Sequence, residues 1–223
     1  NQEAREMEKA EDKDTLDGDQ GASASYTPDW DSLDSRPLPK WYKDAKLGIF
    51  VHWGLYSVPS MGKVGAEWFW RRTERPGEDP LRQADKKQWL KDYFPPNFKY
   101  QDFAPEFKAD LWQPDDWADL FKSSGAKYVV LTAKHHDGYV MWPSKHAWNW
   151  NSKDTGPGRD LVGEMADSVR KRTDLRFGLY NSLTEWYHPK WAYDNQMGKK
   201  TQTFVNEKLQ PELRDMVNIY KPE

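Results

Sequence analysis

Polar and aromatic side chains follow three short apolar segments of the sequence. These side chains are His52, His135, His136, Tyr180 and Asn181. If the three segments are parallel strands, their carboxyl ends lie at one edge of a sheet, where α/β proteins place their active sites. One histidine at such an edge could be incidental. Three histidines at two strand ends indicate a shared ligand pocket.

Two other interpretations of the histidines stay open. The first is a zinc site, because imidazole is a common zinc ligand. Metal-dependent barrel hydrolases usually carry H-x-H after the first strand, whereas this sequence has H-W-G from His52, so we expect no metal. The second is a structural pair formed by His135 and His136, although adjacent residues of an extended strand point to opposite faces. A serine nucleophile has no support, since the sequence contains no G-x-S-x-G motif.

A carboxylate and tryptophans lie between the first two apolar segments. Glu67 and Trp68 begin the sequence EWFW, and Trp142–Ser152 adds three more tryptophans after the second segment. Sugars present directional hydroxyl groups and apolar C–H faces, which a carboxylate and an indole ring suit. The sequence has 13 tryptophans and 15% aromatic residues, more than a core needs, which favours a sugar site. The alternative is that EWFW only fills a barrel mouth and Glu67 is a surface charge.

Strands and helices are expected to alternate along the chain. We predict buried strands within Leu47–Gly54, Tyr128–Thr132 and Leu175–Ser182. Helices are predicted from Pro114 to before Gly125, after Asp160, and from Pro211. This order predicts an α/β fold of the (β/α)8, TIM-barrel type. The chain reaches Glu223 where a fourth strand would start, so we expect about the first half of the barrel.

Composition excludes several classes of site. The 223 residues carry 33 Lys+Arg and 36 Asp+Glu, a net charge of −3, which does not favour nucleic-acid binding. The sequence has no cysteine, which excludes disulfides and thiolate chemistry, and it has no phosphate-binding glycine motif. No apolar run approaches ~18 residues, so no membrane span is predicted. Residues 1–25 are acidic and polar and are predicted to be a disordered tail before a domain at 26–223.

Several of these motifs, in order, carry a family resemblance. The segments LGIFVHWG, EWFW, GAKYVVLTAKHHDG and GLYNSLTEWYHP resemble the retaining α-L-fucosidases of glycoside hydrolase family 29, in particular those of animal lysosomes and plasma. The resemblance implies a (β/α) barrel followed by a β-sandwich. The fucose-binding residues it implies are His52, Glu67, Trp68, His135, His136 and Tyr180. Position 181 departs from the family, since it holds Asn where Tyr or His is expected.

The resemblance also implies an activity. A retaining fucosidase removes terminal α-L-fucose from a fucosylated glycan by double displacement, with one carboxylate as nucleophile and a second as acid/base. The family places both carboxylates beyond Glu223, so we expect no catalytic residue within this chain and no turnover by the chain alone. No cofactor is implied, a lysosomal or secreted location is expected, and homo-oligomerisation of a full-length parent is left open. The alternative is a non-catalytic fucose-binding or enzyme-partner protein of the same fold.

Overall fold

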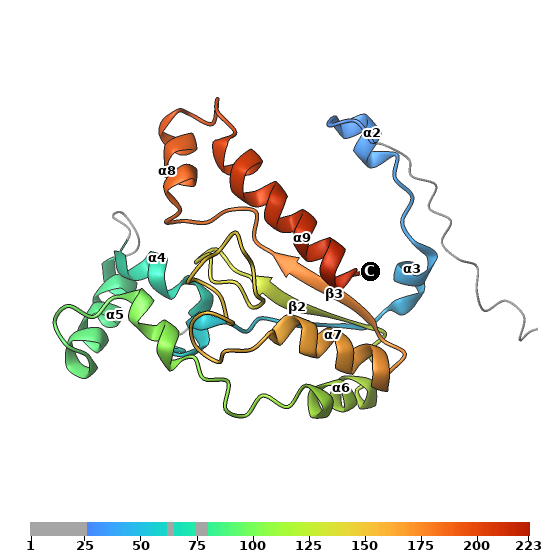
Figure 1. The fold of residues 1–223 in the computed structure, drawn as a ribbon, viewed down its shortest axis with the longest axis horizontal. Helices are drawn as coiled ribbons and strands as arrows, with labels where there is room; N and C mark the ends of the chain where they lie inside the picture. The colour runs from blue at the N-terminus through green and yellow to red at the C-terminus, as the bar shows by residue number, and fades with distance from the viewer. Residues whose placement is uncertain (1–25, 62–64, 75–79) are drawn as a thin grey trace, which may run out of the picture. The chain divides into compact units, whose positions relative to one another are not determined.

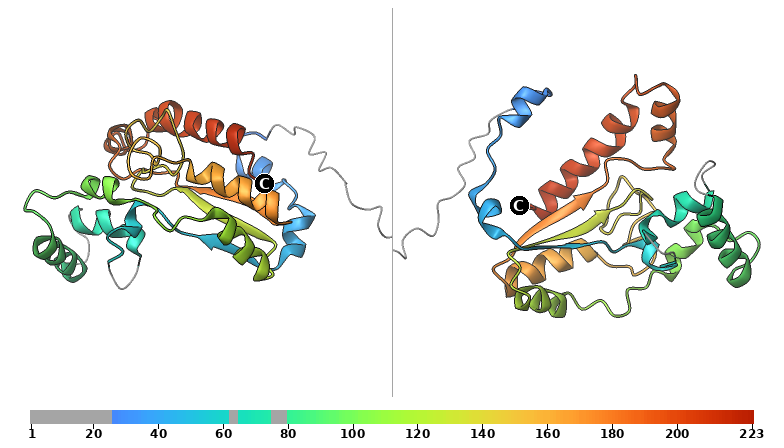
Figure 2. Two further views of the ribbon diagram at one scale, coloured as in Figure 1. Left: turned by 60° about the horizontal axis from the view of Figure 1, so that its bottom comes forward. Right: turned by 180° about the vertical axis from the view of Figure 1, so that it is seen from behind.

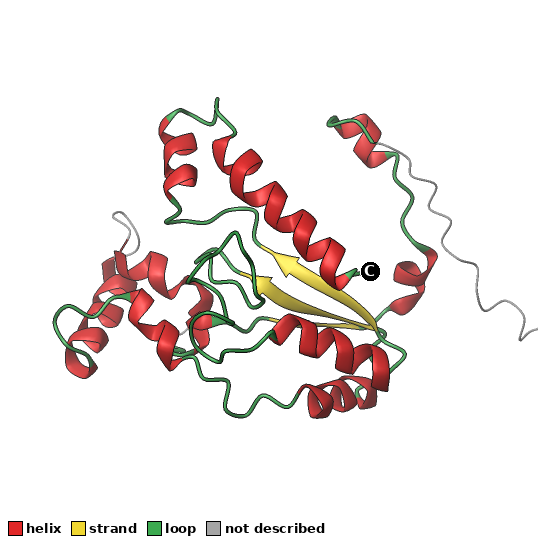
Figure 3. Cartoon of the chain, in the orientation of Figure 1, coloured by secondary structure: helices red, strands yellow, loops and turns green. Residues whose placement is uncertain are grey.

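The structure is a computed structural model that describes residues 26–61, 65–74 and 80–223 (Figures 1 and 3). The predicted disordered tail, 1–25, lies outside the described residues. The chain divides into two compact units, Asn1–Asp44 and Ala45–Glu223. In the first unit, α2 spans Trp30–Asp34, and the side chain of Asp29 caps it by accepting from the backbone N–H of Ser32 at 2.8 Å. Helix α3, Lys40–Ala45, ends at the boundary between the units.

A parallel sheet with the order β1-β2-β3 forms the centre of the second unit. Its strands are β1 (Gly48–Val51), β2 (Tyr128–Lys134) and β3 (Arg176–Asn181). All three predicted strands are therefore present and parallel. Gly48 faces Tyr128 across the first pair, and a Cβ at Gly48 would lie 2.1 Å from the Tyr128 ring, so this register requires glycine.

Two expectations about the sheet need correction. The prediction that the first strand is buried on both faces is wrong, because Phe50 is 54% exposed. Strand β1 pairs only with β2 among the described strands and lies at the sheet edge. The described strands also form an open sheet of three strands, not a barrel. Three strands cannot close, since closure of a small barrel needs about eight tilted strands.

Helices connect the strands, as the alternating pattern predicted. Helix α6 spans Pro114–Ser123, α7 spans Leu161–Arg172 and α9 spans Gln210–Tyr220. Helix α7 packs against α6, α9 and β3 (Figure 2). The carboxylate of Asp160 caps α7 by accepting from the N–H of Gly163 at 2.8 Å, and the hydroxyl of Tyr220 lies 2.9 Å from both Asp160 oxygens. The end of α9 is thereby fixed to the start of α7.

Helix α9 begins differently from the prediction. A π-helical turn, Val205–Leu209, precedes Gln210 directly, so Pro211 lies within a longer helical segment and does not open it. Proline has no N–H to bond the carbonyl four residues earlier, and a turn of irregular spacing accommodates that missing bond. After α9 the chain returns to the sheet, where the backbone N–H of Glu223 donates to the carbonyl of Phe177 at 3.0 Å.

Shorter elements fill the connections. They are the 3-10 helices Leu55–Ser57, Ala66–Trp68 and Tyr100–Glu106, and the helices α4 (Phe69–Glu74), α5 (Pro80–Tyr93) and α8 (Pro189–Gln196). An aromatic cluster packs among the elements that follow β1, with Trp70 stacked on Tyr100 and on Tyr187 at centroid distances of 4.8 and 3.9 Å. None of the described helices is long and apolar enough to cross a membrane.

Candidate functional site

The three strand ends bring their aromatic side chains together. The ring centroid of His52, which follows β1, lies 5.5 Å from that of His135 and 5.4 Å from that of Tyr180. His135 follows β2 directly, and its ring stacks on Tyr180 of β3 at 5.9 Å. This contact set joins all three strands at their carboxyl ends. The side chains predicted to share the edge of the sheet therefore lie together as a cluster of rings.

The second half of the site lies around His136. Its ring stacks on Trp186 at 4.8 Å and meets the edge of Trp68 at 5.9 Å, and the two indoles lie 4.9 Å apart. The rings of His136 and His135 are 4.6 Å apart, so they do not point to opposite faces as predicted. The reason is that β2 ends at Lys134, and strand alternation does not extend to the turn that follows.

Glu67 and Trp68 enter the site from a single 3-10 turn, Ala66–Trp68. Gly65 precedes the turn with φ +67°, and a Cβ there would lie 3.0 Å from Oε1 of Glu67. The glycine therefore lets the turn bring its carboxylate and indole close to the backbone. The guanidinium carbon of Arg71 lies 4.9 Å from the Trp68 ring centroid and 5.4 Å from that of Trp186, which adds a cation–π contact on each indole.

Both neighbouring histidines favour the neutral form. Burial, followed by the charges that His136 and His52 would carry, lowers the pKa of His135 to about 3. Burial also lowers the pKa of His136, whose Nδ1 lies 2.8 Å from the Oγ1 of Thr184. A neutral imidazole has one donor and one acceptor nitrogen. Such rings suit a hydroxylated ligand, which needs both.

Two buried polar atoms at the strand ends have no hydrogen-bond partner within the described part of the chain. They are Nδ1 of His135 and Oδ1 of Asn181. A buried polar atom without a partner is costly, and a ligand hydroxyl would satisfy it. Asn181, where the family resemblance led us to expect Tyr or His, thus also lies at this edge with an open acceptor.

The low pKa of His135 makes stability depend on pH. Below pH ~6.5 the unfolded chain protonates this ring while the folded chain does not, so stability falls as pH decreases from 6.5 toward about 3. A His135→Gln variant should therefore lose less unfolding free energy than the wild type between about pH 7 and about pH 5, measured by urea unfolding. The raised pKa of Asp137 acts in the opposite direction in both proteins and cancels in the comparison. Equal losses would show that the folded chain protonates His135 normally.

Sequence reasoning did not find a buried group of four charges beside the histidines. We call it the four-charge cluster, and its members are Lys134, Glu185, Lys208 and Glu212. Lys134 and Glu185 lie within segments that the sequence analysis had singled out, but their partners lie far along the chain. The only local signal was the i,i+4 spacing of Lys208 and Glu212 on a helix.

Asp137 is a further buried carboxylate near the site. It accepts from the hydroxyl of Tyr100 at 2.6 Å and from the backbone N–H of Tyr139 at 3.1 Å. Burial raises the pKa of Asp137 to about 6 against the effect of these hydrogen bonds. The indole N–H of Trp150 donates to the Asp137 carbonyl at 3.1 Å. Asp137 thus fixes the turn after the histidines.

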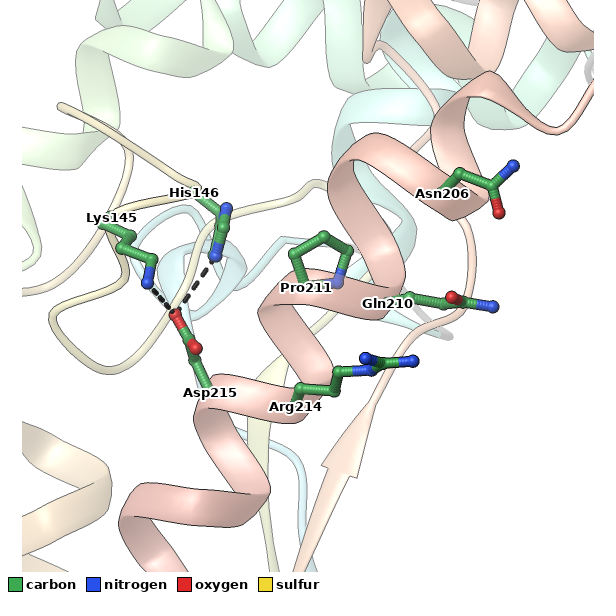
Figure 4. A pocket seen from close by; sticks show the side chains of 7 residues that line it. All are labelled: Lys145, His146, Asn206, Gln210, Pro211, Arg214 and Asp215. Atoms are coloured by element: carbon green, nitrogen blue, oxygen red, sulfur yellow. Dashed lines mark hydrogen bonds and ion pairs between the residues drawn. The ribbon is translucent and has the colours of Figure 1, made fainter.

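The remaining candidates have structural positions. Trp142 is buried in the core, whereas Trp148 is 83% exposed. His188 caps α8 by accepting from the N–H of Lys190 at 3.2 Å. A separate pocket lies between the Lys145–His146 loop and α9, where both side chains contact Oδ2 of Asp215 at 2.9 and 3.1 Å (Figure 4).

The zinc alternative requires a set of side chains arranged as metal ligands. Across residues 26–61, 65–74 and 80–223, no group of three or more His, Asp or Glu side chains is arranged to hold a metal ion. The rings of His52, His135 and His136 pack in edge and stacked contacts with one another and with Tyr180 and Trp186. These contacts describe an aromatic cluster at the sheet edge.

Known proteins with similar sequences are fucosidases. The tissue alpha-L-fucosidase of Rattus norvegicus is 57% identical over 198 residues, which is 89% of this chain and 41% of the rat protein. The plasma alpha-L-fucosidase of Homo sapiens is 46% identical over 202 residues, 91% of this chain and 42% of the human protein. The chain therefore spans about two fifths of the length of these relatives.

Solved structures similar to this chain are also those of fucosidases. An alpha-fucosidase of Thermotoga maritima in complex with a mechanism-based inhibitor superposes with a TM-score of 0.72 at 37% identity, covering 89% of this chain and 48% of that one. The same bacterial enzyme in complex with fucose gives a TM-score of 0.70 at 38% identity. The family model described as alpha-L-fucosidase matches residues 16–223, which include both β-strand ends that carry the histidines and the EWFW turn. On this match, the chain belongs to the alpha-L-fucosidase family.

Proposed function

We propose that this chain supplies the fucose-binding part of an α-L-fucosidase. The observation that carries the proposal is the convergence of His52, His135, His136 and Tyr180 at one sheet edge, beside Trp68. The unpartnered Nδ1 of His135 supports a ligand with hydroxyl groups at this point. The names of the relatives support fucose as that ligand.

Each side chain has a role in binding the sugar. The neutral rings of His135 and His136 would donate to some hydroxyls and accept from others, while Glu67 would accept only. The indole of Trp68 would pack on the apolar C–H face of the sugar. His52 and Tyr180 would close the edge of the pocket.

The reaction we propose is hydrolysis of terminal α-L-fucose from glycoproteins or glycolipids with retention. Retaining glycosidases place two carboxylates ~5–5.5 Å apart. Asp137 bonds Tyr100, and Glu185 bonds Lys134, so both are already engaged in buried contacts. We therefore propose that neither is the nucleophile, that the nucleophile and acid/base lie beyond Glu223, and that the chain alone does not turn over.

We also propose that the three strands are part of a (β/α)8 barrel. The bond from the N–H of Glu223 to the carbonyl of Phe177 supports a further parallel strand beside β3. The likeness to animal tissue and plasma enzymes supports a lysosomal or secreted location for the whole protein. No metal or cofactor is part of the proposal.

Hydrolysis of an aryl α-L-fucoside tests this function. We expect the protein made from the full reading frame to release fucose, with the α anomer as the first product in ¹H NMR spectra, and we expect no release by residues 1–223 alone. Release of the β anomer first would contradict retention, and turnover by residues 1–223 would contradict the position of the catalytic carboxylates. Fucose binding by a full-length protein without hydrolysis would favour the non-catalytic alternative.

A further inference from the structure

The four-charge cluster adjoins the proposed sugar site, because its member Lys134 directly precedes His135 and His136. Nζ of Lys134 is 2.6 Å from Oε1 of Glu185 and 2.7 Å from Oε2 of Glu212. Nζ of Lys208 is 2.6 Å from Oε1 of Glu212 and 3.5 Å from Oε1 of Glu185. The four side chains are only 0–6% exposed. Each ammonium therefore faces both carboxylates, and the charges balance away from water.

The buried charges of this cluster are stabilised by one another, because burial removes their contact with water. Burial opposes the charge of Lys134, but Glu185 and Glu212 hold its pKa above the usual value. Burial opposes the charge of Glu212 as well, but Lys134 and Lys208 hold its pKa below the usual value. Replacing a buried ion network by apolar side chains is often neutral or stabilising, so stability alone is a weak explanation for it. The cluster can instead serve to position the side chains of the proposed sugar site.

The pair Lys134–Glu185 joins the two segments that form the second half of the site. Lys134 directly precedes His135 and His136, and Glu185 stands between Thr184 and Trp186. Three further contacts link these segments. They are the 2.8 Å contact of Thr184 with His136, the backbone bond from Trp186 to the His136 carbonyl at 2.9 Å, and the bond from Ser182 to the Lys134 carbonyl at 3.0 Å.

The backbone at the end of β2 and in the turn after it has two features that permit the contact between Lys134 and Glu185. The register of β2 and β3 shifts between Thr132 and Lys134, where three residues of β2 oppose two of β3. Such an irregularity changes the side to which the next side chains point. Gly138 follows with φ +78°, and a Cβ there would lie 2.9 Å from Oε2 of Glu185. A glycine is thus needed for the Glu185 carboxylate to lie against the histidine turn.

The other two members of the four-charge cluster connect the site to α9. Lys208 lies in the π turn and Glu212 in the first turn of α9. The loop after Trp142 contacts the same helix through Ser144, whose hydroxyl donates to Glu212 at 3.0 Å. This bond holds the Glu212 carboxylate, whose other oxygen faces Lys134.

We infer that the four-charge cluster positions His136, Thr184 and Trp186 for sugar binding, with Glu185 as the positioning residue that joins the strand end of β2 to the loop after β3. The cluster does not touch the sugar. It acts by fixing where the ring of His136 and the indole of Trp186 lie. This inference rests on the proposed function for the identity of the ligand, but the geometry of His136 is observable without any ligand.

Three variants of the chain test the inference. Glu185→Gln removes the link and leaves two ammonium groups with one carboxylate. Glu185→Gln with Lys208→Met removes the same link but leaves the balanced pair Lys134–Glu212 at 2.7 Å. Glu207→Gln is the matched control, since it breaks an exposed ion pair with Lys190 on the same π turn. The readouts are L-fucose affinity, thermal unfolding, and ¹H–¹⁵N spectra of the histidine ring nitrogens.

We expect the charge-balanced double variant to remain folded, to shift the ring signals of His136, and to bind L-fucose at least about tenfold more weakly. Glu207→Gln should match the wild type in all three readouts. If Glu185→Gln does not fold, the double variant decides the question. Unchanged affinity and unchanged His136 signals in a folded double variant would overturn the inference. If the wild type does not bind L-fucose, the proposed function fails, and the His136 signals alone then decide for or against positioning.

Discussion

Replacing His136 with alanine is expected to lower kcat/KM for an aryl α-L-fucoside by ~10- to 1,000-fold in the protein made from the full reading frame. The ring lies between Trp68 and Trp186 and contacts Thr184 on one nitrogen. Its removal would cost the buried hydrogen bond that the other ring nitrogen would make to the sugar and would leave a gap beside the indoles. Steady-state kinetics with the wild type and the variant provide the measurement.

His146 provides the matched control for this substitution. Like His136, it is a partly buried histidine, but its ring contacts Asp215 and it lies in the separate pocket beside α9. His146→Ala should leave kcat/KM within about twofold of the wild type, since it removes no group near the sugar. If His136→Ala behaves like His146→Ala, then His136 is a structural residue and the site as described is wrong.

Replacing Lys134 with methionine is expected to have the largest effect on stability. The substitution leaves Glu185 and Glu212 buried with only Lys208 to balance them. Removing one partner of a buried ion pair typically costs about 3–5 kcal/mol, because the other charge is left uncompensated. We therefore expect a loss of about that size in the free energy of unfolding, measured by urea denaturation at neutral pH.

A surface lysine shows whether the loss is specific. Lys171 pairs with Asp167 on the exposed face of α7, where their side chains are 73% and 67% exposed. Lys171→Met should leave the urea midpoint close to that of the wild type, because exposed pairs contribute little. A Lys134→Met variant as stable as Lys171→Met would mean that the cluster is hydrated or that its carboxylates take up protons.

The strands and the starts of two helices could be predicted from the sequence because they depend on local signals. Short apolar runs such as Tyr128–Thr132 mark the strands, and Pro114 and Asp160 mark the starts of α6 and α7. Parallel pairing then places the residues after each strand at one edge. That rule alone predicts that His52, His135 and Tyr180 lie near one another, and in the structure their rings are in contact.

Other features depend on contacts that no local pattern encodes. Lys134 looks like one more polar residue at a strand end, but its second partner, Glu212, is 78 residues away. The exposure of Phe50 depends on which strand lies beside β1, not on the apolar run that contains it. The contact of Trp186 with His136 depends on the path of the loop after β3. These are long-range properties, so the sequence alone could name the residues but not their partners.

We have proposed that the edge formed by His135, His136 and Trp68 binds L-fucose. The most direct measurement is a titration of the chain with L-fucose and, separately, with its mirror image D-fucose, followed in ¹H–¹⁵N spectra of the histidine ring nitrogens. We expect saturable shifts of the His135 and His136 signals with L-fucose, and no such shifts with D-fucose at the same concentrations. Equal responses to the two sugars, or no response to L-fucose, would contradict the proposal.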